Sequence, residues 1–174
     1  IGFIRRALEK AGYPNVPVIS VNLSGLENNP GFKMTPSLIQ RGLYALEFGD
    51  IFLRCLYRTR PYEAVPGSAN ALHEKWKKEV IAFVTQDKLL SHRKFKRMCR
   101  EIIRDFDRLE RIDVQKPRVG VVGEILVKFH PAANNDLVGL LEAEGAEAVV
   151  PDLTDFLLYC FYNTGFKADN LGFS

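Results

Sequence analysis

The sequence lacks any long apolar run. No stretch approaches the roughly 18 to 20 apolar residues that a membrane-spanning helix needs. Residues 1–12 have the charge pattern of an amphipathic helix and not that of a signal peptide. We therefore expect a soluble protein with no membrane partner. The chain starts at Ile1 without a methionine and stops soon after a hydrophobic segment, so we expect a segment cut from a larger protein.

Cysteine is scarce, and the common catalytic motifs are absent. The 3 cysteines are widely spaced and form no CxxC pair, which disfavours a disulfide framework or a self-contained zinc site and indicates a reducing, cytoplasmic compartment. Gly120 and Gly123 leave only a GxxG pattern, whereas a dinucleotide pyrophosphate requires GxGxxG. GxxxxGK[ST], GxSxG and HExxH are missing too. No complete catalytic site is predicted, and we expect no enzymatic activity from the chain alone.

The composition is that of an ordinary globular protein. Of 174 residues, 47% are hydrophobic and 26% are charged, enough for one domain with a core or for two small lobes. The formal net charge of +3 is too small to indicate a nucleic-acid partner. The basic face of residues 92–111 is interrupted by acidic residues and has no interleaved aromatics, so a solvated helix face is favoured over a nucleic-acid-binding helix.

Strand and loop signals follow the opening helix. Residues 16–22 have the β-branched content of a short buried strand, and residues 26–34 read as a loop. Thr35 and Pro36 then supply an N-cap and a first helical residue. We expect that helix to run to about residue 57, with an interruption at Gly49-Asp50.

Two further helices are predicted in the middle of the chain. Residues 58–67 hold two prolines and cannot be regular helix. Ser68 is expected to cap a helix to about Thr85, and Ser91 to open another. In the latter, one apolar stripe lies opposite a basic face; its members are Phe95, Met98, Cys99, Ile102, Ile103 and Phe106.

The last third changes to strand, helix, strand. An apolar run at 118–124, a helix at 136–144 and a second apolar run at 147–150 are typical of a βαβ unit with a right-handed crossover. We predict an α/β fold of Rossmann-like parallel βαβ units joined by a helical segment, within a larger two-lobed protein. The predicted parts are the end of a first α/β lobe (1–34), a helical connecting region (35–115) and the start of a second Rossmann-like lobe (116–174).

Three strand ends and one loop are candidates for ligand binding, and one of the strand ends offers Asn22, Ser24 and Gly25. In parallel sheets, ligands meet the carboxyl ends of strands. The loop after the first run offers a helix N-terminus for an anion such as phosphate, unless its asparagines only cap that helix; its candidates are Glu124, Lys128, His130, Asn134 and Asn135. After the second run, Asp152 is a ligand candidate or a helix cap. The proline-constrained loop permits bidentate anion recognition or is a plain connection; its candidates are Arg58, Arg60, Tyr62 and Glu63.

Several segments together resemble one protein family. They are PVISVN (17–22), RPYE (60–63) followed by PGSA (66–69), KPRVGVVGEI (116–125), KFHP (128–131) with Asn134-Asn135, and PDLTDFLLYC (151–160). The chain resembles the activase-related proteins of 2-hydroxyacyl-CoA dehydratases, also described as CoA-substrate-specific enzyme activases, over most of its length. Those are long chains that join actin-like ATPase modules to a dehydratase-like region, and this segment is similar to the latter.

The resemblance implies a role in ATP-driven, low-potential electron transfer to or within an iron-sulfur 2-hydroxyacyl-CoA dehydratase system. It implies as partners the other domains of the parent chain, dehydratase or activator subunits, and acyl-CoA. An iron-sulfur cluster belongs to the full-length family, with Cys160 the one candidate metal ligand here because it follows a predicted strand end. A cluster needs about four thiolates, so this segment is not expected to bind one alone. The alternative is a non-catalytic regulatory or scaffolding module that binds a partner protein or acyl-CoA.

Overall fold

A computed structural model describes residues 2–16, 18 and 35–172 of the chain. The predicted loop at 26–34, the candidates Asn22, Ser24 and Gly25, and most of the predicted strand at 16–22 lie outside these described residues. The chain forms two compact units, residues 1–35 and 36–174. The predicted helical region and the predicted second lobe therefore belong to the same unit.

In the first unit, the predicted opening helix is present. Helix α1 spans Gly2–Lys10 and has no buried residue. It is followed by Gly12 with a φ of 85°, a left-handed conformation that glycine adopts at low cost where a helix ends.

The second unit begins with three packed helices. They are α2 (Pro36–Thr59), α3 (Ser68–Val84) and α4 (His92–Asp107), with a short 3-10 turn η1 (Arg60–Tyr62) after α2. Helix α2 runs unbroken through Gly49 and Asp50, so the predicted interruption is wrong. Tertiary packing stabilises that helix despite its central glycine. The bundle core consists of Phe48, Phe52, Ala69, Trp76, Val80, Phe83, Leu90, Met98, Ile102 and Phe106.

The helix starts follow local capping chemistry. The Ser91 side chain accepts a hydrogen bond from the Lys94 backbone N–H at 3.3 Å, as predicted for α4. The prediction for α3 is wrong, because its N-cap is Gly67 and Ser68 is already helical. Glu63 takes over the capping role, because its carboxylate accepts hydrogen bonds from the backbone N–H groups of Gly67 at 2.6 Å and Ala69 at 2.8 Å. The N-terminus of a helix also stabilises a nearby negative charge such as this carboxylate.

The rest of the unit is a small βα lobe. Its elements are β1 (Arg118–Gly120), α5 (Ile125–Phe129), α6 (Pro131–Asn134), α7 (Leu137–Ala143), β2 (Glu147–Val149) and α8 (Leu153–Leu171). Strands β1 and β2 pair in parallel, with Arg118 opposite Glu147 and Gly120 opposite Val149. The predicted parallel βαβ pairing is confirmed. The strands are shorter than predicted, and two small helices not predicted from the sequence precede α7.

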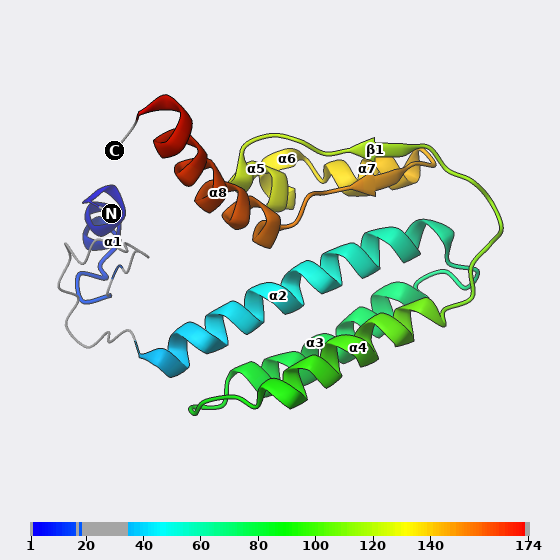
Figure 1. The fold of residues 1–174 in the computed structure, drawn as a ribbon, viewed down its shortest axis with the longest axis horizontal. Coiled ribbons are helices and arrows are strands. Elements are labelled where there is room, and N and C mark those ends of the chain that lie inside the picture. The colour runs from blue at the N-terminus through cyan, green and yellow to red at the C-terminus, as the bar shows by residue number, and fades with distance from the viewer. Residues whose placement is uncertain (1, 17, 19–34, 173–174) are drawn as a thin grey trace. The chain divides into compact units, whose positions relative to one another are not determined.

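Helix α2 lies between the two halves of this unit. Figure 1 shows α3 and α4 along one side of α2 and the βα lobe along the other. The lobe has a core of Val121, Val138, Ala148 and Val150, and Leu53 and Tyr57 of α2 pack against it. The described part of the protein is thus mostly helical, with a small parallel sheet. It is a mixed α/β architecture in which α2 packs against both hydrophobic cores.

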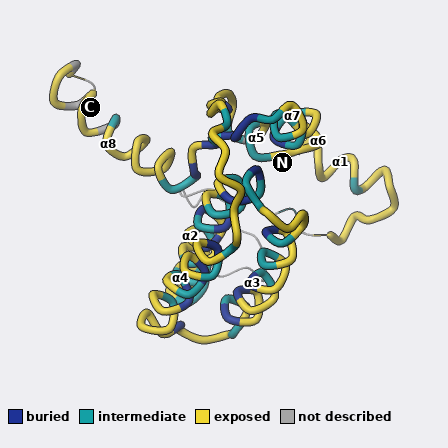
Figure 2. Tube along the Cα trace, turned by 90° about the vertical axis from the view of Figure 1, so that its right-hand side faces the viewer, coloured by how far each residue is buried: buried dark blue, intermediate teal, exposed yellow. Residues whose placement is uncertain are grey.

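Helix α8 extends from the end of β2 and is largely exposed along its length (Figure 2). The Asp152 side chain caps it by accepting from the Asp155 backbone N–H at 3.1 Å, as the sequence indicates. Several large apolar side chains of α8 face solvent, including Phe161 with 74% of its surface exposed. Among the described residues, no helix is both long and apolar enough to cross a membrane.

Candidate functional site

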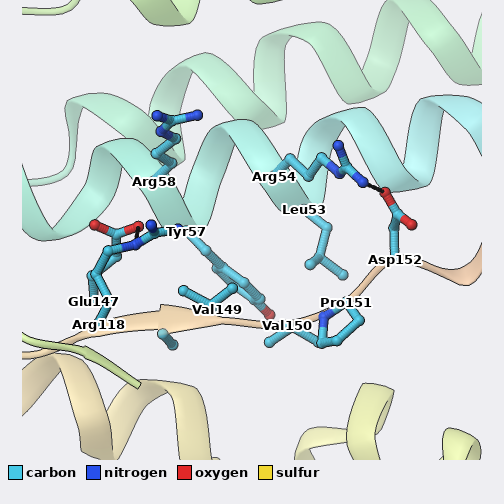
Figure 3. Close-up of a pocket in the computed structure, with 11 residues that line it drawn as sticks. Leu53, Arg54, Tyr57, Arg58, Arg118, Glu147, Val149, Val150, Pro151 and Asp152 are labelled. Atoms are coloured by element: carbon cyan, nitrogen blue, oxygen red, sulfur yellow. Dashed lines mark hydrogen bonds and ion pairs between the residues drawn. The ribbon is translucent and has the colours of Figure 1, made fainter. Parts of the chain in front are cut away.

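A pocket of about 230 Å³ lies between α2 and β2, and we call it the arginine pocket. Helix α2 contributes Arg54 and Arg58, four residues apart and hence on one helical face. Figure 3 shows Tyr57 extending toward β2, whereas Arg54 reaches toward Asp152 and Arg58 points away from β2. The lining is completed by Leu53, Arg118, Glu147, Ala148, Val149, Val150 and Pro151.

Two of the three arginines in this pocket are engaged by carboxylates. Arg54 forms ion pairs with Asp152 and, at 3.0 Å, with Asp155. Arg118 Nε donates to Glu147 Oε1 at 3.0 Å. Arg58 makes no hydrogen bond or ion pair within the described part of the chain. Three arginines and two carboxylates thus line the pocket, and Arg58 is the arginine whose side chain points away from β2 and has no carboxylate partner among the described residues.

The remaining residues of the proline-constrained loop bond to the rest of the unit. Arg60 makes a bidentate pair with Glu142 of α7, with Nε to Oε2 at 2.7 Å and Nη2 to Oε1 at 2.9 Å. Burial lowers the pKa of Arg60 and the Glu142 carboxylate raises it, and the carboxylate prevails. The Tyr62 hydroxyl donates to Glu147 at 2.8 Å. Burial and this donation to a carboxylate both raise the pKa of Tyr62.

These bonds change the interpretation of the loop. Arg60, Tyr62 and Glu63 were candidates for ligand recognition, yet each bonds a group of the protein itself. An arginine with a bidentate carboxylate partner has little left to offer a second anion. Arg58 is the loop candidate that faces a pocket without such a partner, and it shares the arginine pocket with the candidate Asp152.

The candidates after β1 support local structure. Glu124 caps α5 by accepting from the Val127 N–H at 3.0 Å. The Asn134 amide donates to the carbonyls of Val127 and Lys128 at 3.0 and 3.1 Å, and its oxygen accepts from the Leu137 N–H at 3.2 Å. The N-cap residue of α7 is Asp136, so neither asparagine is the predicted N-cap, although Asn134, the last residue of α6, bonds the first N–H of α7.

The other three residues of that set do not join the arginine pocket. The Lys128 ammonium lies 4.6 Å from the centroid of the Phe129 ring. His130 is the exposed residue between α5 and α6, and Asn135 has a left-handed φ of 56° just before α7. The structure therefore brings Arg58 and Asp152 together at one pocket and leaves the post-β1 candidates outside it.

The cysteines do not form a ligand set for an iron-sulfur cluster. Cys55 and Cys99 pack against the bundle core, and burial raises the pKa of the Cys55 thiol to about 11 and that of Cys99 in the same direction. Both thiols therefore keep their protons to a higher pH than an exposed cysteine does. Cys160 lies exposed on α8. The described residues contain no group of three or more Cys, His, Asp or Glu side chains placed to hold a metal.

A second, apolar pocket adjoins the arginine pocket. It has a volume of about 540 Å³ and is lined by Ala45, Leu46, Gly49, Asp50, Leu53, Ile125, Phe129 and Leu153. Leu53 lines both pockets. A pocket lined by charged residues and an apolar pocket therefore follow one another along α2.

Sequence reasoning missed several residues that shape this site. Arg54 stands four residues before Arg58, but Arg58 was predicted to lie in the loop of residues 58–67. That prediction is wrong for its first two residues, because α2 continues to Thr59 and so places both arginines on one helical face. Glu142 and Glu147 carried no local signal, because their partners are 82 and 85 residues away. Asp50 was assigned to a helix interruption; it instead accepts hydrogen bonds from the N–H groups of Leu153 and Thr154 at 2.9 and 2.8 Å.

Comparisons with known proteins give no family assignment. The chain matches no protein-family model, no curated protein and no solved structure. Its function is therefore inferred from the residues and their geometry.

Proposed function

We propose that this chain is the dehydratase-like segment of an acyl-CoA dehydratase activase-related protein of the cytoplasm. Its β1–α7–β2 unit is the start of a Rossmann-like lobe, and α2 to α4 are the helices that connect it to the preceding lobe. The observation that supports this best is that two of the segments behind the family resemblance, far apart in the sequence, bond to the same carboxylate, Glu147, which lies outside both.

Two of those segments show this linkage. In RPYE, Arg60 bonds Glu142 of α7 and Tyr62 bonds Glu147 of β2. In KPRVGVVGEI, Arg118 bonds the same Glu147. Residues that hold one arrangement of helices and strands would have this property, because each of these hydrogen bonds is partly buried.

Within such a protein, the segment positions other parts and performs no chemistry itself. ATP-driven electron transfer in this system relies on an iron-sulfur cluster, and we propose that the cluster is held by residues outside this segment. The inward-packed Cys55 and Cys99 support that view. The partners are then the other domains of the parent chain, dehydratase or activator subunits, and acyl-CoA.

Anaerobic reconstitution with iron and sulfide tests this proposal. The 174-residue chain and the full parent protein would be compared by iron content and visible absorption. We expect a cluster on the parent and none on the chain.

Replacing Cys160 with alanine in the parent then decides whether this exposed thiol adds one ligand to a set supplied elsewhere. Cys99→Ala is the matched control and should leave the iron content unchanged. A stable cluster on the chain alone would contradict the proposal.

The adjoining pockets favour a second candidate, a non-catalytic module that binds acyl-CoA. A coenzyme A thioester has charged phosphates and an apolar acyl group, and the two pockets that meet at Leu53 match these two properties. Gly49 lines the apolar pocket, and a Cβ placed there meets no other atom within 4 Å.

Substitution of Gly49 tests this second candidate. Gly49→Leu should fill the apolar pocket, whereas Gly49→Ala removes only a methyl-sized volume and raises helix propensity as well. Butyryl-CoA and free coenzyme A would be titrated against both variants by calorimetry. Acyl-CoA binding predicts that butyryl-CoA binds more tightly than coenzyme A to the unmodified chain and that Gly49→Leu abolishes the difference. Equal affinity of the two compounds for the unmodified chain would rule the acyl pocket out.

A further inference from the structure

A third pocket lies on the side of α2 that faces α4. It has a volume of about 430 Å³ and is lined by Arg54, Cys55, Arg58, Thr59, Ile103, Phe106, Asp107 and Arg111. Arg58 points toward this side, away from β2 (Figure 3). Three guanidinium groups and one carboxylate therefore surround the same space.

The position of Arg111 is fixed by its backbone. Residues Glu63 and Arg111 form an isolated antiparallel bridge, and the Ile112 N–H donates to the Tyr62 carbonyl at 2.8 Å. The Arg111 guanidinium donates to the Phe106 carbonyl at 3.2 Å and lies 3.4 Å from Asp107. One wall of the pocket is thus a preorganised cation that retains further N–H donors.

Arg58 lines the same pocket and has no acceptor of its own within the described part of the chain. Its neighbours Arg54 and Arg111 both have carboxylate partners, while Arg58 has none among the described residues. The fields of Arg111 and Arg58 both act on the thiol of Cys55, where they partly offset the effect of burial. Arg58 and Arg111, which lie on different parts of the chain, therefore line the pocket together with the thiol on which both act.

We propose that Arg58 and Arg111, with Arg54 at the rim, form a binding site for a phosphate group. Arginine is the side chain best suited to this task, because its planar fork donates two parallel hydrogen bonds to phosphate oxygens. Thr59, Ile103 and the aromatic ring of Phe106 line the same pocket. This site does not depend on the family proposal, since it rests on the pocket alone.

Calorimetric titration of the full chain with inorganic pyrophosphate at low ionic strength tests the site. Arg58→Gln should weaken binding about tenfold or more, because a charge-assisted hydrogen bond is lost. Arg93→Gln is the matched control: it removes the same charge from an exposed position in the first turn of α4 and should change the affinity less than about twofold. Arg58→Lys, which keeps the charge and loses the fork, should fall between the two.

Alkylation of Cys55 gives an independent reading. Bound pyrophosphate would cancel the arginine fields that favour the thiolate, so Cys55 should be alkylated more slowly in its presence while Cys99 is unaffected. Parallel titrations with coenzyme A identify whether the phosphate is free or carried by a larger ligand, and either supports the site if its binding depends on Arg58. Absence of binding by both compounds, or equal weakening by Arg58→Gln and Arg93→Gln, would overturn the proposal.

Discussion

The helical bundle and the βα lobe are stabilised in different ways. The bundle buries large side chains, and Phe48, Ile102 and Phe106 have at most 1% of their surface exposed. The lobe has only valine and alanine in its buried core, and Leu53 and Tyr57 of α2 pack against that core. Polar links tie it to the bundle, through Arg60, Tyr62 and Asp50.

This difference in core size predicts that the bundle and the βα lobe differ in local stability. The free energy gained by burying apolar side chains increases with the area that they bury, so the bundle should be the more stable part. A lobe with a small core and many polar links is expected to open locally at lower free energy. The candidate pockets border α2, at the boundary between these two regions.

The largest expected effect is in the bundle core. Phe106→Ala leaves a cavity at a fully buried position and should lower the free energy of unfolding by about 3 to 5 kcal/mol. Ile103, three residues earlier on α4 and 50% exposed, is the matched control, and Ile103→Ala should cost less than about 1 kcal/mol. Urea unfolding followed by the fluorescence of Trp76, the one tryptophan of the chain, measures both. Similar losses for the two variants would contradict the assigned core.

A smaller effect is expected at the link between α2 and α8. Asp50 accepts from the first N–H groups of α8 and from the Thr154 hydroxyl. Asp50→Asn keeps the shape but presents a donor to these donors, and should cost about 1 to 2 kcal/mol. Hydrogen exchange in the first turns of α8 should accelerate, while exchange in α3 should not change.

Asp155→Asn is the control for this link. Asp155 is at the same helix end, but its carboxylate is exposed and pairs only with Arg54, so its loss should cost less than about 1 kcal/mol. If the two variants accelerated exchange in α8 equally, Asp50 would not be the anchor of that helix.

The smallest effect concerns the thiol of Cys55. Burial raises its pKa from 9.0 to about 11 in the folded chain, with Arg111 and Arg58 opposing the change. Between pH 9 and 11 the unfolded thiol ionises while the folded thiol keeps its proton, so stability falls as the pH rises. Cys55→Ala should make the decline between pH 9 and 11 less steep, measured by urea unfolding at several pH values. Cys160→Ala should leave the slope as it is, and an unchanged slope in Cys55→Ala would contradict the buried environment of this thiol.

Local sequence signals predicted the elements well but not the contacts between them. Ser91 and Asp152 were identifiable as helix caps because capping is a matter of a few neighbouring residues. The parallel pairing of β1 and β2 followed from a strand-helix-strand pattern. In contrast, Ser68 was assigned a cap that Glu63 provides from outside the helix, and Gly49 did not break α2 because packing on both sides outweighs propensity.

The candidate site was predictable only in part. Arg58 and Asp152 were named from the sequence and do line one pocket. The hydrogen-bond partners of Arg60 and Tyr62 were not predictable, since Glu142 and Glu147 come within hydrogen-bonding distance only when the whole unit folds. A charged side chain on a loop looks the same in the sequence whether it awaits a ligand or completes an internal pair.

Native-state hydrogen exchange of Arg60→Met, combined with pyrophosphate titration, tests most directly whether the motif residues hold the lobe in place. Loss of the bidentate bond to Glu142 should speed exchange in α7 and β2 by roughly tenfold or more, leave α3 and α4 unchanged, and preserve pyrophosphate binding at Arg58. Unchanged exchange in α7 and β2 together with lost pyrophosphate binding would contradict the account, because Arg60 would then serve a ligand and not the fold.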